Sequence, residues 1–206
     1  MTISELYDLL CDESFQDPNT GSLFFPAYMY VYNPEKEYFV RQEIVKIKER
    51  LSRPNTFIDV LVINLFEEFR NFLGNRIFIE QKNVLEMLLE SEPSEPDKVS
   101  QTLKREANTK EFFAAVNERI SSHMSETDDL KKSYVFVHGF GEIYPYLRAS
   151  KFLSNFEKYI KGYKIILFYP GSAKEHYSLF NLLNDENPYR AIKLINPEDQ
   201  EAVKQS

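Results

Sequence analysis

The sequence predicts a three-layer α/β fold, with a mainly parallel, doubly wound sheet of about five strands and a helical insertion. Three observations lead to this prediction. Several short runs of residues are almost wholly apolar, which is typical of strands buried on both faces of a parallel sheet. Segments with helical apolar spacing lie between these runs, where crossover helices are expected. The stretch from about 66 to 132 has helical spacing and no comparable apolar run, which indicates the insertion.

The N-terminal part of the chain reads as a helix followed by a βαβ unit. Ile3 to Leu10 carries apolar residues at helical spacing, and the aromatic run over 24–32 predicts the first strand. Asn33 and Pro34 then favour a helix start, because an asparagine cap before a proline suits the first helical turn. The apolar run over 59–65 predicts the second strand.

The insertion is predicted to be helical throughout. Helical spacing occurs at about 65–73, 81–90, 98–106 and 109–124, and an acidic, proline-containing loop over 91–97 separates the second and third of these segments. The apolar side chains of the last segment share one helical face, which predicts packing against a core and not a cofactor site. They are Phe112, Phe113, Val116 and Ile120.

After the insertion, strands and helices alternate again. Apolar runs predict strands over 134–138, 164–169 and 191–195, with a helix over 149–160 between the first two. Asn196 and Pro197 indicate the start of a terminal helix. One α/β domain over 1–206 is therefore expected, with the insertion at about 66–132.

Charge and cysteine content exclude several classes of protein. Lys and Arg number 25 against 32 Asp and Glu, a net charge of −7 without a basic cluster, so strong DNA binding by the isolated chain is not expected. The single Cys11 cannot form an intramolecular disulfide, which favours a reducing compartment. Neither a membrane span nor a signal peptide is recognisable. The sequence thus predicts a soluble, cytoplasmic protein with no membrane partner.

In a doubly wound sheet, ligands bind outside the carboxyl ends of the strands. Polar or glycine residues follow the predicted strands at Asn33, Asn64, His138 to Gly141, and Pro170 to Ser172. The two glycines of His-Gly-Phe-Gly suit a turn that brings backbone N–H groups close to a ligand, or simply a tight turn. Both interpretations stay open.

The usual catalytic motifs are missing. The segment from Val135 to Gly141 resembles the oxyanion-hole strand of α/β-hydrolases, but no G-x-S-x-G motif occurs, and Ser172 lacks the second glycine. His176 lies too close to that serine to serve as its base in the usual order. We therefore expect no hydrolysis of ATP, esters or DNA.

Nucleotide and metal motifs are also missing. There is no P-loop, and Tyr144 occupies the third glycine position of a G-x-G-x-x-G motif. His123, His138 and His176 are scattered along the chain, and His123 is expected to be solvated at a polar helix end. The sequence predicts no metal site and no cofactor.

Two arginines and two tyrosines near predicted strand ends form the richest polar group, together with Glu142 and Asn187: Tyr144, Arg148, Tyr189 and Arg190. Arginine binds carboxylate or phosphate groups bidentately, so these residues are candidates for an anion or partner site. Alternatively, Arg148 and Arg190 pair with internal acids such as Glu142 or Asp185 and fix loops.

Four blocks of the C-terminal third have distinctive sequences: Phe136-Val-His-Gly-Phe-Gly-Glu-Ile-Tyr-Pro-Tyr-Leu-Arg148, Phe152-Leu-Ser-Asn-Phe156, Ile166-Leu-Phe-Tyr-Pro-Gly171 and Asn187-Pro-Tyr-Arg-Ala191. Together they resemble the BrxB family of bacteriophage exclusion (BREX) operons. Matching positions are Gly139, Gly141, Tyr144, Pro145, Leu147, Arg148, Asn155, Tyr169, Pro170, Gly171, Tyr189 and Arg190. His138 replaces the family's threonine, and Ser154 replaces an asparagine. The N-terminal third resembles the family more loosely.

The resemblance implies a cytoplasmic component of antiphage defence that acts beside a large ATPase, a PglZ-type protein and a DNA methyltransferase. The leading hypothesis is an assembly or regulatory subunit that binds other BREX proteins. A nucleotide- or small-anion-sensing domain is the alternative, followed by a divergent hydrolase that uses the His-Gly-Phe-Gly turn. The candidate ligand- or partner-binding residues are His138, Gly139, Gly141, Tyr144, Arg148, Tyr169, Gly171, Tyr189 and Arg190.

Overall fold

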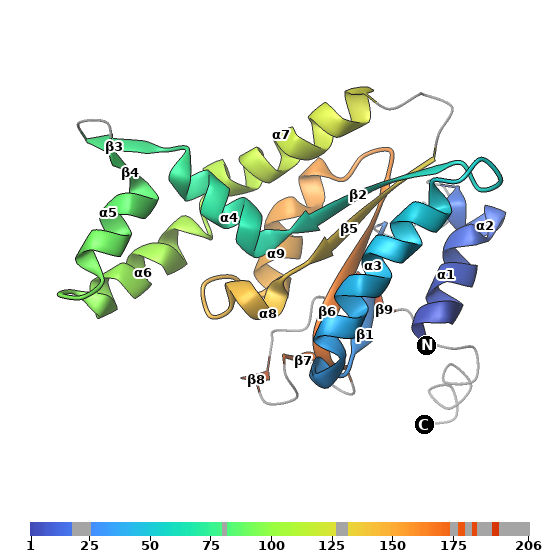
Figure 1. The fold of residues 1–206 in the computed structure, drawn as a ribbon, viewed down its shortest axis with the longest axis horizontal. Coiled ribbons are helices and arrows are strands. Elements are labelled where there is room, and N and C mark those ends of the chain that lie inside the picture. The colour runs from blue at the N-terminus through green and yellow to red at the C-terminus, as the bar shows by residue number, and fades with distance from the viewer. Residues whose placement is uncertain are drawn as a thin grey trace.

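The structure, a computed structural model, contains a parallel sheet covered by helices on both faces (Figure 1). It describes residues 1–17, 26–79, 82–126, 132–173, 177–179, 183–184 and 191–193. The strand order is β2-β5-β6-β1-β9, and each neighbouring pair along this path is parallel. The strands are β1 (Ala27–Tyr32), β2 (Ile58–Asn64), β5 (Lys132–His138), β6 (Lys164–Ala173) and β9 (Ala191–Lys193). The predicted fold class is confirmed.

The two faces of the sheet differ in chemistry because successive side chains of a strand point to opposite faces. One face is mainly aromatic and includes Tyr30, Tyr134, Phe136 and Phe168. The other face is mainly aliphatic along the same strands, as Val135 in β5 illustrates. Both faces are buried, which is why these strands have continuous apolar sequences.

Helices from different parts of the chain cover the two faces. The aromatic face packs against α1 (Ile3–Cys11) and α3 (Glu37–Leu51), with α2 (Glu13–Gln16) beside α1 and η1 (Pro34–Lys36) before α3. The aliphatic face packs against α4 (Leu65–Gly74), α7 (Lys110–Glu126) and α9 (Ala149–Phe156), which η2 (Glu157–Tyr159) follows. The short helix α8 (Phe140–Ile143) begins just beyond the end of β5.

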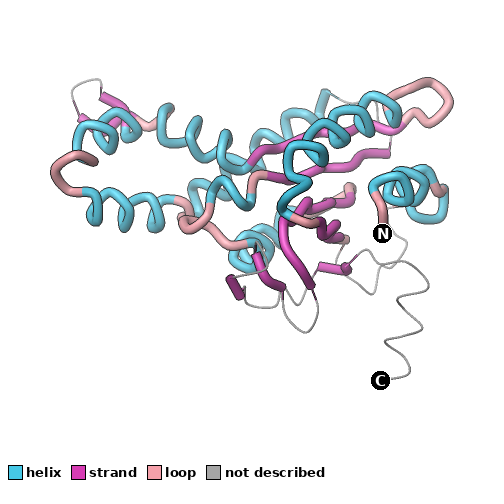
Figure 2. Tube along the Cα trace, turned by 60° about the horizontal axis from the view of Figure 1, so that its bottom comes forward, coloured by secondary structure: helices cyan, strands magenta, loops and turns pink. Residues whose placement is uncertain are grey.

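Part of the insertion forms an arm that extends away from the sheet. The arm comprises a two-stranded ribbon, β3 (Ile77–Ile79) and β4 (Lys82–Asn83), followed by α5 (Val84–Ser91) and α6 (Pro96–Glu106). Figures 1 and 2 show it from two directions, beyond the end of α4. Its buried residues Val84, Leu88 and Val99 belong to the same apolar core as the aliphatic face of the sheet.

Several predicted boundaries need correction. The helix expected over 81–90 begins only at Val84, and the β3–β4 ribbon before it was missed. The strand expected over 164–169 continues to Ala173, because Gly171 to Ala173 pairs antiparallel with β7 (Tyr177–Leu179). Strand β7 in turn pairs with β8 (Leu183–Asn184). The predicted terminal helix lies outside the described residues. The same holds for residues 24–25 of the first predicted strand and residues 194–195 of the fifth.

His123 is not simply solvated, as the sequence had suggested. Its Nε2 lies 2.6 Å from Oδ2 of Asp59, so this pair connects α7 to β2, and both side chains are largely shielded from solvent. None of the described helices combines the length and the apolar character that crossing a bilayer requires.

Candidate functional site

The carboxyl ends of β1 and β5 direct the chain to opposite sides of the sheet. After β1 the chain enters η1 and α3 on the aromatic face, and after β2 and β5 it enters the helices of the aliphatic face. Only β6 separates β1 from β5 in the sheet. A crevice for ligands opens at such a point in other doubly wound proteins. This edge is therefore the candidate functional site.

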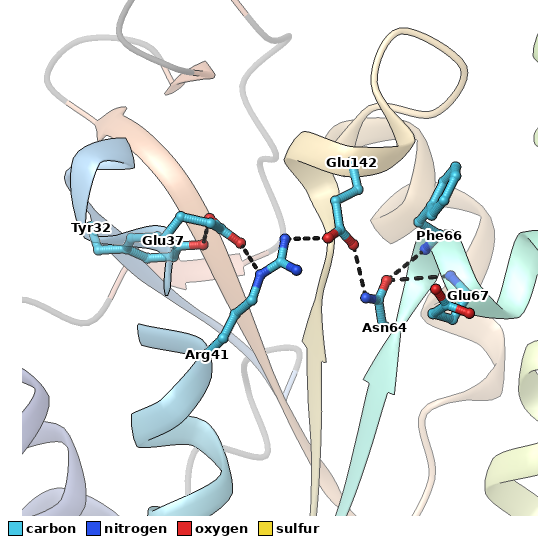
Figure 3. A network of polar contacts seen from close by, with 7 residues as sticks. All are labelled: Tyr32, Glu37, Arg41, Asn64, Phe66, Glu67 and Glu142. Atoms are coloured by element: carbon cyan, nitrogen blue, oxygen red, sulfur yellow. Dashed lines mark hydrogen bonds and ion pairs between the residues drawn. The ribbon is translucent and has the colours of Figure 1, made fainter. Parts of the chain in front are cut away.

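On the β1 side, three residues form a chain of polar contacts (Figure 3). The Tyr32 hydroxyl donates to Oε2 of Glu37 at 2.5 Å, and Nε of Arg41 donates to Oε1 of the same carboxylate at 2.7 Å. Burial and the Glu37 carboxylate raise the pKa of the Tyr32 hydroxyl, so this group stays a donor. Partial burial opposes the charge of Arg41, but Glu37 and Glu142 outweigh that effect and raise the pKa of its guanidinium.

The contacts continue across the sheet edge to β2. Arg41 forms an ion pair with Oε1 of Glu142 in α8, and Nδ2 of Asn64 donates to Oε2 of Glu142 at 2.8 Å. Oδ1 of Asn64 accepts from the backbone N–H groups of Phe66 and Glu67, at 2.9 and 3.3 Å. Asn64 is thus the N-cap of α4 and also a partner of Glu142. We call the connected set Tyr32, Glu37, Arg41, Glu142 and Asn64 the edge network.

Gly139 allows the turn before α8 to lie close to Asn64, where β2 ends and α4 begins. Its φ is +86°, a left-handed conformation that residues with a Cβ atom rarely adopt. A Cβ at this position would lie 2.4 Å from Oδ1 of Asn64. The glycine that follows His138 therefore has a steric role, which the sequence had left open against a ligand-binding role.

His138 is the last residue of β5 and lies close enough to Arg41, Glu37 and Glu142 to interact with them electrostatically. Its Nδ1 is buried and has no hydrogen-bond partner among the described residues. Burial lowers the pKa of His138, the Arg41 charge lowers it further, and Glu142 and Glu37 oppose this change. A neutral imidazole is favoured as a result.

The other predicted site residues have different surroundings. Gly141 lies within α8, and Tyr144 follows that helix and is half-buried. Tyr169 is buried in β6, where its ring packs against Phe140 at a centroid distance of 6.2 Å. Gly171 pairs with β7. Two further candidates, Tyr189 and Arg190, lie outside the described residues.

Arg148 does not join the edge network. Glu142, its suggested partner, is bound by Arg41 and Asn64 instead. Arg148 is the exposed N-cap residue of α9, and no ion pair links it to another described residue. It lines a cavity between the α8–α9 connection and the end of α6. Asp185, the other suggested partner, is outside the described residues.

Sequence reasoning identified one half of the network and missed the other. Asn64 and Glu142 were among the residues noted near strand ends, whereas Tyr32, Glu37 and Arg41 were not. Glu37 and Arg41 are four residues apart on one helix, a spacing that also describes many ordinary surface pairs. Only the crossing of α3 over the sheet edge brings Arg41 to Glu142, and the sequence carries no local signal for it.

The two carboxylates of the edge network are occupied by partners within the protein, which limits the chemistry available at this edge. The carboxylates of Glu37 and Glu142 each accept from Arg41 and from a neutral donor, so their charge is largely compensated within the protein. Across the described ranges, no three His, Cys, Asp or Glu side chains are placed to hold a metal ion. The arrangement joins elements of the fold to one another.

Sequence comparison reveals the family. A family profile described as "BREX protein BrxB" matches residues 62–194, which include the end of β2, the insertion, β5, β6 and the edge residues Asn64 and Glu142. The chain belongs to the BrxB family. The BREX protein BrxB of Bacillus cereus (strain H3081.97) is 24% identical over 201 residues, covering 94% of this chain and 96% of the relative.

This membership gives the protein its biological setting. BrxB proteins belong to bacteriophage exclusion, so the chain is a component of a phage defence system. The resemblance that the C-terminal blocks suggested is confirmed. No solved structure is significantly similar to this BrxB chain.

Proposed function

We infer that this chain is a non-catalytic assembly or regulatory subunit of a BREX complex, which acts by binding other BREX proteins. The PglZ-type protein and the large ATPase are the first partners to test, followed by the methyltransferase. We also take residues 1–206 to work as one BrxB-like domain, in which the arm is part of the binding surface.

The edge network is the observation that carries this proposal. In α/β enzymes, the edge of the sheet at the switch point holds the ligand and the reacting groups. Here Arg41 and Glu142 bridge that edge, and Asn64 caps α4 while it holds Glu142. The polar groups of the edge thus stabilise the packing of α3 and α8 on the sheet. A catalytic role would require this ion pair to open.

The arm supplies a surface suited to a protein partner. Ile77 and Phe78 of β3 are 77% and 53% exposed, and Leu89 of the neighbouring helix α5 is 60% exposed. Large exposed apolar side chains that gather in one part of a protein often mark interaction sites. We call these three residues the arm patch. Its apolar chemistry favours a partner that presents an apolar surface of its own.

Co-purification from the intact operon tests the proposal. A tagged wild-type chain should retain at least one other BREX protein, and the Ile77→Glu/Phe78→Glu double variant should lose most of it, because burying two carboxylates without partners is costly. The matched control is Val45→Glu on α3, since Val45 is 53% exposed, like Phe78, but lies on the opposite face of the sheet.

Circular dichroism and thermal denaturation of the isolated variants must show that both remain folded. Loss of the partner by the arm variant alone supports a binding surface on the arm. Equal retention by all three chains would remove the arm from the proposal, and a wild-type chain that retains no BREX protein would overturn the assembly function itself.

A further inference from the structure

A second feature, separate from the sheet edge, is a cavity of about 540 Å³ between the arm and the start of α9. It lies where the end of α6 meets the α8–α9 connection, and Nδ2 of Asn108 joins the two segments by donating to the Tyr146 carbonyl at 2.9 Å. The residues that matter for its chemistry are Lys104, Arg105, Asn108, Tyr146, Arg148 and Lys151.

The charges around this cavity are all of one sign. Lys104, Arg105, Arg148 and Lys151 line it, and none of its described lining residues is acidic. Arg105 is 3.3 Å from Glu106, but that carboxylate also binds Arg76 and does not line the cavity. Lys104 and Arg148 form no ion pair with any described residue. The cavity is thus locally basic, although the net charge of the chain is −7.

The start of α9 strengthens the case for an anion. Arg148 is its N-cap residue and provides no side-chain cap, and the first turn contains no acidic residue. A helix N-terminus carries a partial positive charge and normally attracts acidic groups, whereas here Arg148 and Lys151 add positive charge to it. A bound anion would pair with Lys104 and Arg148 and with the helix end together.

The size and lining of the cavity indicate the class of ligand. Its volume is in the range of small-molecule sites, about 300–1,000 Å³. Tyr146 offers an aromatic ring, Gln101 offers an amide group, and the arginines offer forks that match a phosphate. We propose that this cavity binds the phosphate group of a nucleotide-sized molecule, with Arg148 and Lys104 as its principal ligands.

A longer nucleic acid is a poorer match. Polynucleotides bind along extended basic grooves or patches, whereas the cations here converge on one cavity of a strongly acidic chain. This site goes beyond the assembly role, since the arm patch and the cavity use different residues. Either proposal can fail while the other holds.

Isothermal titration calorimetry of the purified chain with ATP, AMP and inorganic phosphate tests the site. Wild type should bind at least one of the nucleotides, with weaker or undetectable binding of inorganic phosphate. Arg148→Ala and Lys104→Ala should each weaken nucleotide binding at least tenfold. Lys98→Ala is the matched control, because Lys98 is an exposed lysine of the same helix as Lys104, pairs with Glu95 and is not among the cavity residues.

The melting temperature of each variant is measured without ligand, to show that the variant is folded. If Arg148→Ala does not fold, Arg148→Lys replaces it as a variant that keeps the positive charge. Absence of nucleotide binding by wild type at millimolar concentration would overturn the proposal. The proposal would also be overturned if the nucleotide affinities of Arg148→Ala and Lys104→Ala were within twofold of the wild-type affinity. The ligand class would also be wrong if the chain bound a 20-nucleotide single strand or an acidic peptide in a way that requires Arg148, but did not bind nucleotides.

Discussion

Arg41 of α3 and Glu142 of α8 form an ion pair across the carboxyl edge of the sheet, and thereby join helices that follow β1 and β5 (Figure 3). The pair is extended by Glu37 and Tyr32 on one side and by Asn64 on the other. Part of the protein's own structure therefore occupies the position where α/β enzymes bind a substrate.

The Arg41–Glu142 pair should contribute to stability through a measurable coupling. In a double-mutant cycle with Arg41→Ala and Glu142→Ala, we expect a coupling energy of about 1–2 kcal/mol in urea denaturation, because both side chains are largely shielded and hydrogen-bonded. The control cycle is Lys46→Ala with Glu43→Ala on the same helix, a pair whose lysine side chain is 59% exposed and that should couple by less than about 0.5 kcal/mol. Equal coupling in both cycles would show that the network is an ordinary surface feature.

Gly139 should tolerate substitution less well than Gly162, although both have a positive φ. Gly162→Ala adds a Cβ that meets nothing within 4 Å and should cost about 1–2 kcal/mol of unfolding free energy for the left-handed backbone. Gly139→Ala has the same backbone cost and must also displace Asn64 from its capping position on α4. Loss of that cap should lower the unfolding free energy by about another 1 kcal/mol. Urea titrations of both variants measure the difference. Similar losses would mean that the contact with Asn64 does not matter.

His138 should make the protein less stable in mild acid. Its pKa in the folded state is lowered by burial and by Arg41, with Glu142 and Glu37 opposing, so the unfolded chain binds a proton more readily. The stabilisation is complete above the unfolded pKa of about 6.5 and is lost as the pH falls through the folded pKa. The free energy of unfolding should therefore decrease from pH 7.5 downwards.

The variant His138→Thr isolates this contribution, since other titrating groups are common to both proteins. As the pH falls below about 6.5, the unfolding free energy of wild type should decrease more than that of the variant. A difference that is constant between pH 7.5 and pH 5 would contradict the assignment to His138.

Arg148→Asp should stabilise the isolated chain. Aspartate is a good N-cap residue and complements the positive end of α9, so the free energy of unfolding should increase by about 1 kcal/mol. Arg148→Asn, a neutral cap, should give part of this gain. A loss of more than about 1 kcal/mol in either variant would indicate that Arg148 is held in an internal ion pair after all.

The sequence predicted those parts of the fold whose pattern is local. The strands predicted over 59–65 and 134–138 are recognisable because strands buried on both faces are mostly apolar, and they correspond to β2 (Ile58–Asn64) and β5 (Lys132–His138). Asn33 and Pro34 mark the turn after β1. The β3–β4 ribbon was missed because strands of three and two residues contain too little periodicity.

The edge network depends on distances that no local pattern encodes. The sequence left open a pairing of Glu142 with Arg148, which lies close to it along the chain, but the order β2-β5-β6-β1 and the path of α3 bring Arg41 to Glu142 instead. The cavity at Arg148 likewise combines α6 with the α8–α9 connection, and their approach was not predictable from helical spacing alone.

Phage restriction by the complete BREX operon tests the central claim most directly, with the resident gene replaced by one of two folded variants. The efficiency of plating for His138→Thr should equal that of wild type, because no reaction at the sheet edge is required. The Ile77→Glu/Phe78→Glu variant should lose restriction, because it cannot bind its partner. Restriction lost by the first variant and kept by the second would contradict a subunit that acts through protein contacts.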